Sequence, residues 1–157
     1  MNIKSTFPAL LILLAATIIA PTQPSSAITP DHGPSAFGQG QFRYFTELVD
    51  FSFEVRANKN GNAHGRAVFE YLSTQTRVVV KIDCLRIGSS DALMTGSVLQ
   101  SDDPDFPKLT NVVFAAIDGE TQDYITPLFM SPFSNCSEGG YPLTMFPLSA
   151  DAIQVNP

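Results

Sequence analysis

The sequence predicts an all-β fold, either an antiparallel small β-barrel or a β-sandwich, with about seven to eight strands and one disulfide. Three observations favour this fold. Apolar and polar residues alternate in several short segments, turn-forming residues recur roughly every ten residues, and no segment after residue 27 has the spacing of an amphipathic helix. Short strands joined by such regular turns are typical of sandwiches and small barrels.

The first expected strands follow one another closely. Residues Gln41–Val49 hold aromatic and β-branched side chains, and apolar and polar residues alternate along Phe51–Arg56. The Asn60-Gly61 pair favours the positive φ angles of a tight hairpin. We therefore expect His64–Leu72 to return antiparallel to Phe51–Arg56.

The middle of the chain predicts a second hairpin and a loop. Arg77–Ile87 is the most strand-like run, and its even-numbered residues from Val78 to Cys84 are expected on one face. A turn at Gly88–Asp91 and a return strand at Ala92–Gln100 follow. Ser101–Lys108 is expected to be a loop, because its prolines and aspartates suit neither a helix nor a central strand.

The last third of the chain is expected to contain short strands and one long loop. Asn111–Ile117, Tyr124–Thr126 and Ala152–Val155 have the composition of strands. Between them, Pro127–Pro147 contains four prolines and a glycine pair. This segment is expected to cross the domain as a long loop.

The first 27 residues have the order of a secretory signal peptide. Lys4 gives a positive start, Ala9–Ala20 is an uninterrupted apolar run, and small residues precede a cleavage site after Ala27. The run of about a dozen apolar residues is shorter than the roughly 20 that a membrane-spanning helix needs. We therefore expect an exported protein, periplasmic or extracellular, without a membrane anchor. Residues 28–40 are expected to form a flexible leader before a single domain at residues 41–157.

The excess of acidic over basic residues argues against two classes of binding partner. The chain has 9 lysines and arginines against 15 aspartates and glutamates, a formal net charge of −6. A chain of this charge repels the phosphate backbone of nucleic acid and an anionic membrane surface. An unknown protein or a small apolar ligand is the expected partner, and no cofactor is expected.

Cys84 and Cys136 are the only cysteines. In an exported protein, two cysteines predict one disulfide. A pair of metal-binding thiolates is the alternative, although no histidine or further cysteine lies near either residue in the sequence.

An ordered set of strand, turn and cysteine residues resembles uncharacterised secreted bacterial all-β domain proteins, including the domain found after choice-of-anchor segments. The set comprises Phe51–Val55, Asn60-Gly61, His64-Gly65, Tyr71, Ile82–Leu85, Thr95-Gly96, Ala116–Glu120, Asp123, Cys136 and Ile153–Val155. The resemblance covers residues 42–156 and implies an exported all-β domain. It brings no established catalytic residues. The apolar, proline-rich loop Pro127–Pro147 and the chain before Phe42 depart from the family.

The sequence lacks the motifs of common catalytic sites. Its only histidines are His32, in the expected leader, and His64, in an expected strand, and it has neither a nucleophile elbow nor an H-E-x-x-H motif. The expected disulfide removes the cysteine nucleophiles. We therefore expect no enzymatic activity.

Two acidic clusters are weak candidates for calcium binding, since extracellular modules bind this ion through carboxylate-rich loops. The clusters are Asp102, Asp103 and Asp105, then Asp118, Glu120 and Asp123. Their spacing matches no EF-hand, and aspartate next to glycine or proline is also an ordinary turn former. Both interpretations stay open at this point.

The long loop carries five large apolar residues: Phe129, Phe133, Tyr141, Met145 and Phe146. They either cap the core or form an exposed contact or ligand surface. The favoured function is therefore a non-enzymatic binding or structural module of the cell envelope or secreted fraction. A small barrel that carries an apolar ligand, with Phe129, Phe133 and Met145 near its mouth, is the alternative. A hydrolase is the third.

Overall fold

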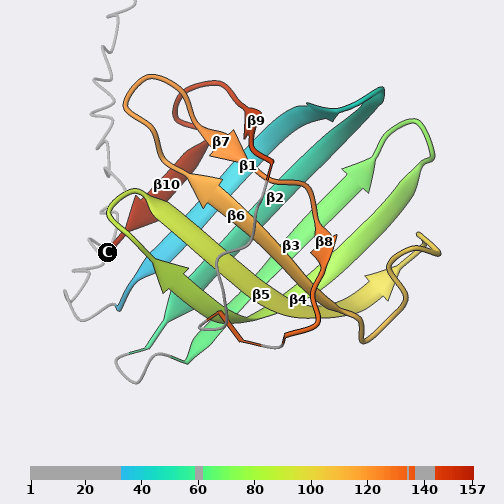
Figure 1. Cartoon of the computed structure of the whole chain (residues 1–157), viewed down its shortest axis with the longest axis horizontal. Coiled ribbons are helices and arrows are strands. Elements are labelled where there is room, and N and C mark those ends of the chain that lie inside the picture. Colours follow the sequence, from blue (N-terminus) through green and yellow to red (C-terminus); the bar gives the residue numbers. More distant parts are fainter. Residues whose placement is uncertain (1–32, 59–61, 134, 137–143) are drawn as a thin grey trace, which may run out of the picture.

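The computed structural model describes residues 33–58, 62–133, 135–136 and 144–157, and within these ranges the chain forms strands and no helix (Figure 1). The strands are β1 Ser35–Tyr44, β2 Glu47–Ala57, β3 Ala63–Tyr71, β4 Thr76–Ile87, β5 Asp91–Ser101, β6 Asn111–Ile117, β7 Tyr124–Ile125, β8 Phe129–Met130, β9 Phe146–Pro147 and β10 Ile153–Asn156. The all-β prediction is confirmed. No helix in the described part of the chain is long and apolar enough to cross a membrane.

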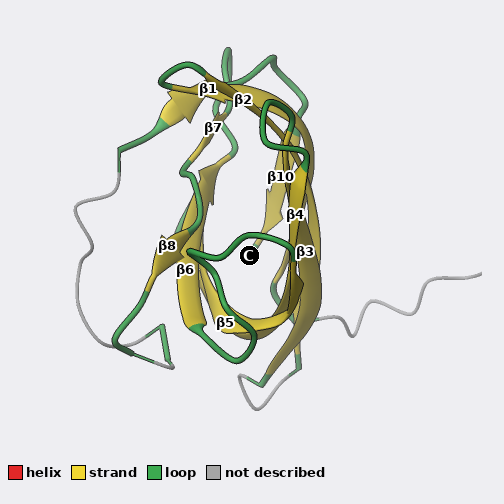
Figure 2. Ribbon diagram, turned by 90° about the vertical axis from the view of Figure 1, so that its right-hand side faces the viewer, coloured by secondary structure: helices red, strands yellow, loops and turns green. Residues whose placement is uncertain are grey.

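All the strands belong to one antiparallel sheet. Their order is β10-β1-β2-β3-β4-β5-β6-β7-β9, and β8 also pairs with β6. The sheet bends over on itself, so that β6, β7 and β8 lie on one side and β3, β4 and β10 on the other (Figure 2). It is not closed into a barrel, because β10 and β9 end the sheet without pairing with each other.

The described strands outnumber those expected, and the bounds of the first two strands also differ. The short strands β8 and β9 lie within Pro127–Pro147, which was expected to be loop throughout. The expected strand Gln41–Val49 contains the two-residue turn Phe45-Thr46 between β1 and β2. Strand β1 begins well before Gln41, so the expected leader is wrong over Ser35–Gly40.

Two glycines explain why β1 is not evident in the sequence, since glycine is depleted in strands. Gly38 pairs with Phe53 and Gly40 with Phe51 on β2. A Cβ atom on Gly38 would approach Cε1 of Phe53 to 2.7 Å. The glycine therefore leaves room for the aromatic ring of the neighbouring strand, an arrangement known to stabilise glycine in sheets.

Phenylalanine rings fill the space between the two sides of the sheet. Phe69 and Phe114 are buried, with ring centroids 5.3 Å apart, and Phe53 lies 5.6 Å from Phe114. Phe42 and Phe51 extend this aromatic core, with centroids 6.0 Å apart. The alternation seen along Phe51–Arg56 therefore places its apolar side chains in the core, as predicted.

The disulfide between Cys84 and Cys136 is confirmed, but Cys84 does not lie in the main core. The pairing of β4 with β5 shifts between Ile82 and Cys84, and a β-bulge of this kind turns the following side chains to the other face. The prediction that Cys84 shares a face with Ile82 is therefore wrong. A second, smaller apolar cluster, called the outer cluster below, contains Leu93, Val113, Ala115 and Cys136, with Cys84, Phe129 and Met145 packed against it.

Candidate ligand pocket at the hairpin end

Three connections gather at one end of the sheet, which we call the hairpin end. They are the β1–β2 turn, the β3–β4 turn and the β5–β6 loop, on the right in Figure 1. Both ends of the described domain lie at the opposite end, where Ser35 of β1 pairs with Asn156 of β10. The hairpin end therefore brings together residues that are far apart in the sequence.

A pocket of about 500 Å³ opens at the hairpin end. Its walls combine aromatic rings with carboxylates, and its volume lies in the range of small-molecule sites. The lining residues are Tyr44, Glu47, Tyr71, Thr74, Asp103, Asp105, Phe106, Pro127, Leu128, Phe129 and Met130.

The Glu47 carboxylate is fixed in place by the β3–β4 turn. One of its oxygens accepts a hydrogen bond from the backbone N–H of Ser73 at 2.8 Å, and the other accepts one from the Ser73 hydroxyl. These donors favour the charged form and lower the pKa of Glu47 below its ordinary 4.5. Glu47 therefore presents a stable negative charge at the pocket.

Tyr71 is the second pocket residue with a shifted pKa. Burial raises the pKa of its phenol, and the nearby Asp103, Tyr44 and Glu47 raise it further. The hydroxyl of Tyr71 therefore stays protonated at neutral pH. Groups with perturbed pKa values gather at functional sites, and Glu47 and Tyr71 both belong to this pocket.

The β5–β6 loop supplies the remaining carboxylates. The Ser101 hydroxyl accepts a hydrogen bond from the backbone N–H of Asp103 at 2.9 Å. The Asp103 carboxylate in turn accepts one from the backbone N–H of Asp105 at 2.9 Å. The backbone N–H of Phe106 donates to the Asp103 carbonyl at 3.2 Å. This tight turn holds Asp103, Asp105 and Phe106 side by side along the pocket wall.

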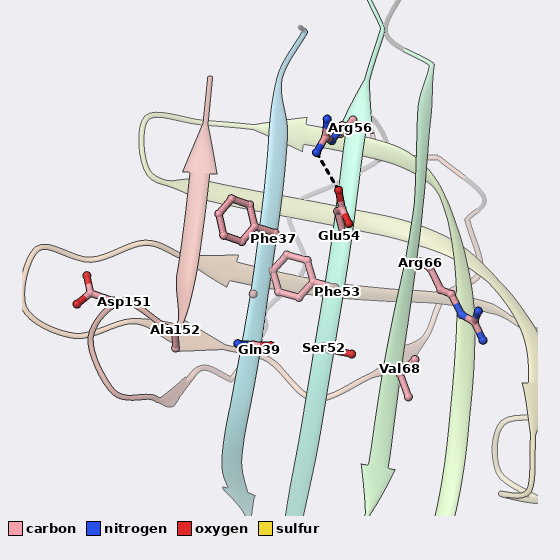
Figure 3. A pocket seen from close by; sticks show the side chains of 11 residues that line it. Phe37, Gln39, Ser52, Phe53, Glu54, Arg56, Arg66, Val68, Asp151 and Ala152 are labelled. Atoms are coloured by element: carbon pink, nitrogen blue, oxygen red, sulfur yellow. Dashed lines mark hydrogen bonds and ion pairs between the residues drawn. The ribbon is translucent and has the colours of Figure 1, made fainter. Parts of the chain in front are cut away.

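A larger hollow of about 630 Å³ lies on the outer face of β1, β2 and β3, beside the segment before β10 (Figure 3). Its charged residues compensate one another, since Arg56 and Glu54 form an ion pair at 3.0 Å with both side chains well exposed. The hairpin-end pocket, with its concentrated negative charge, is therefore the better candidate site.

The five apolar residues of the long loop do not form one site. Phe129 lines the hairpin-end pocket and packs against the outer cluster, where Met145 also packs. Phe146 packs against the main core. Phe133 is 38% exposed, and Tyr141 lies outside the described residues.

The second acidic cluster binds the backbone of the last strand. The buried Asp123 carboxylate accepts a hydrogen bond from the N–H of Ile153 at 2.8 Å, and that of Asp118 accepts one from the N–H of Val155 at 3.0 Å. Glu120 is exposed. Within the described ranges, no group of three acidic, histidine or cysteine side chains could hold a metal ion. Neither acidic cluster gains support as a calcium site.

Several pocket residues have no distinguishing signal in the sequence. Asp103, Asp105 and Phe129 were candidates, and Asp102 of the same loop is exposed outside the pocket. Tyr44, Glu47 and Tyr71 were missed. In an antiparallel meander, every second connection lies at the same end of the sheet. This rule could have predicted that the β1–β2 and β3–β4 turns, which these residues flank, lie close together.

Comparison with known protein families, curated proteins and solved structures found no match to this chain. The resemblance to secreted bacterial β-domains stays a prediction.

Proposed function

We propose that this protein is an exported, non-enzymatic binding module that takes a ligand with an organic cation at the hairpin-end pocket. One observation carries the proposal: three carboxylates and the rings of two tyrosines and two phenylalanines line a single hollow. Aromatic faces and nearby carboxylates attract ammonium and quaternary ammonium groups. The rings also provide apolar surface for the body of such a ligand.

Export is supported by two independent features. The first 27 residues follow the order of a secretory signal peptide. The Cys84–Cys136 disulfide is of the kind that persists in oxidising compartments such as the periplasm or the extracellular space. The resemblance to secreted bacterial domains agrees with both, and bacterial origin is part of the proposal.

The alternative of an apolar-ligand carrier has less support. A carrier needs free space between the two sides of the sheet, and the buried rings of Phe53, Phe69 and Phe114 occupy its centre. An apolar ligand would also leave the carboxylates of Glu47 and Asp103 without a partner of opposite charge. A cationic ligand would contact the faces of the aromatic rings and would pair with the carboxylates.

The proposal is tested by calorimetric titration of the exported chain with choline and with 3,3-dimethylbutan-1-ol, the neutral molecule of the same shape. We expect choline to bind about tenfold or more tightly than the neutral molecule, because only choline gains the cation–π and carboxylate attraction. Equal affinity of the two, or no binding of either, would overturn the proposal.

The variant Glu47→Gln locates the site. It removes the charge at the pocket while keeping the shape of the side chain, and we expect choline affinity to fall about tenfold. The matched control is Glu54→Gln, which removes an exposed carboxylate on the outer face of β2. Choline affinity should not change in the control.

A further inference from the structure

Large apolar side chains project from the hairpin end. Phe45 in the β1–β2 turn is 79% exposed, and Leu72 in the β3–β4 turn is 41% exposed. Leu109 in the β5–β6 loop is 74% exposed, and Met130 of β8 is 63% exposed. Each of the three connections at this end therefore carries one large apolar residue in solvent. We call these four residues the apolar tips.

The opposite end differs in character. Its described connections contain Gly88, Ser89 and Ser90 between β4 and β5, and the polar segment 118–123 between β6 and β7. None of the exposed large hydrophobic residues of the described chain lies in these connections. Of the seven exposed large hydrophobic residues in the described chain, four therefore lie at the hairpin end, and the others are Phe37 of β1, Leu99 of β5 and Phe133 after β8.

The backbone at two tips is held in a conformation that their side chains disfavour. Phe45 has φ of 55° and Leu109 has φ of 71°, in the left-handed region where glycine and asparagine are the ordinary residues. The Leu109 N–H donates to the Val98 carbonyl at 2.9 Å, which anchors this turn to β5. Glycine or asparagine would form both turns with less strain, so the turns themselves do not require phenylalanine or leucine.

Two of the apolar tips adjoin the pocket. Met130 is part of the pocket wall. The ring of Phe45 lies edge-on against Tyr44, another wall residue, with centroids 4.8 Å apart. The exposed cations Arg43 and Lys108 lie next in sequence to Tyr44 and Leu109. A negatively charged aromatic pocket, apolar projections and nearby positive charge therefore occur together at one end of the molecule.

We infer that the hairpin end docks on a bilayer of zwitterionic phosphocholine lipids, with the apolar tips in the membrane interface and the quaternary ammonium of one headgroup in the pocket. This inference rests on the proposed function. Charge complementarity selects this surface, because the carboxylates attract the ammonium while the net charge of −6 opposes docking on anionic lipids. The apolar tips lie on separate connections, and the fluid interface accommodates separate projections, whereas a protein partner would need a matching recess for each.

The test is flotation of the exported chain with vesicles of phosphatidylcholine or of phosphatidylglycerol. We expect the chain to float with phosphatidylcholine and to remain unbound with phosphatidylglycerol. The double variant Phe45→Asn, Leu109→Asn removes two tips, and asparagine tolerates their positive φ angles, so the fold is retained. Its vesicle affinity should fall about tenfold or more, because apolar area no longer enters the interface.

Two controls separate the inference from the proposed function. The variant Phe37→Ser removes a 45% exposed ring from β1, beside Gln154 of β10 and away from the hairpin end, and should leave flotation unchanged. The double variant should retain calorimetric binding of free choline. Choline binding without flotation, equal flotation with both lipids, or full flotation of the double variant would overturn membrane docking and leave the pocket proposal intact. If the unmodified chain does not bind choline, both the membrane docking and the proposed function of the pocket are overturned.

Discussion

The carboxylate of Asp123 accepts a hydrogen bond from the backbone N–H of Ile153 at 2.8 Å, and this contact joins the β6–β7 loop to the last strand. Asp118 makes the equivalent contact with Val155 at 3.0 Å. Both N–H groups belong to β10, which pairs through its backbone with β1 alone. The carboxylates of Asp118 and Asp123 therefore connect the β6–β7 loop to β10 across the open side of the sheet. They also accept hydrogen bonds from N–H groups of this edge strand, which could otherwise pair with a second chain and cause aggregation.

Removal of this bridge should destabilise the domain. Asp123→Ala deletes a buried carboxylate that accepts from Ile153 and, at 3.0 Å, from Gly119. Because the N–H groups of Ile153 and Gly119 would lose their acceptor, we expect the free energy of unfolding to fall by about 3 kcal/mol in urea denaturation. Hydrogen exchange at the Ile153 amide should accelerate more than at core amides of β3. The exposed Glu120→Ala in the same loop is the control, and an equal effect of both variants would contradict this account.

The glycines of β1 give a second prediction. Gly38→Ala places a Cβ atom 2.5 Å from Cδ1 of Ile153 and 2.7 Å from Cε1 of Phe53, so the core must shift. We expect a loss of about 1–3 kcal/mol in stability, as for other overpacked cores. Gly40→Ala is the matched variant, because its nearest neighbour, Cε1 of Phe51, lies at 3.3 Å. Thermal denaturation should show a markedly lower Tm only for Gly38→Ala.

The disulfide gives a third prediction. Cys84 and Cys136 are separated by 52 residues in the chain, and closing a loop of this length stabilises the native state by about 4 kcal/mol in the chain-entropy model. The double variant Cys84→Ala, Cys136→Ala should lose stability of this order in urea denaturation. Hydrogen exchange should increase most around Val113 and Ala115, which share the outer cluster. Unchanged stability would show that packing alone holds this segment.

The acid side of the pH profile tests the contact between Glu47 and Ser73. The pKa of Glu47 is lowered in the folded state, so its contribution to stability is present above the ordinary value of 4.5 and is lost as pH falls through the folded-state pKa. Ser73→Ala removes the hydroxyl donor, and the Glu47 titration midpoint measured by NMR should rise toward 4.5. Ser89→Ala, in the turn at the opposite end, should leave the midpoint unchanged. A midpoint equally low in both variants would contradict the assigned cause.

Much of the fold was predictable because period-two alternation reports burial directly. Phe51, Phe53 and Val55 are buried on one face, as expected. Alternation could not predict the face on which Cys84 lies, because the bulge between Ile82 and Cys84 reverses the faces. Alternation also could not predict the first part of β1. Gly38 is favourable in this strand because the ring of Phe53 on the neighbouring strand occupies the space beside it, and the sequence does not show that contact.

The candidate site was less predictable than the fold. From the sequence alone, Asp123 could be a calcium ligand. The structure shows instead that its carboxylate accepts a hydrogen bond from the backbone N–H of Ile153, 30 residues later in the chain. Glu47 and Tyr71 gain their character from neighbours across the sheet and from burial. The residues that flank Glu47 and Tyr71 in the sequence do not indicate these contacts.

Binding of an organic cation among the rings of the hairpin-end pocket is tested by NMR, through nuclear Overhauser effects between the methyl protons of bound choline and the aromatic protons of the exported chain. We expect contacts with the rings of Tyr44, Phe106 and Phe129, which line the hairpin-end pocket. Contacts with Phe37 in the outer-face hollow, or no contacts to any ring at saturating choline, would contradict this expectation.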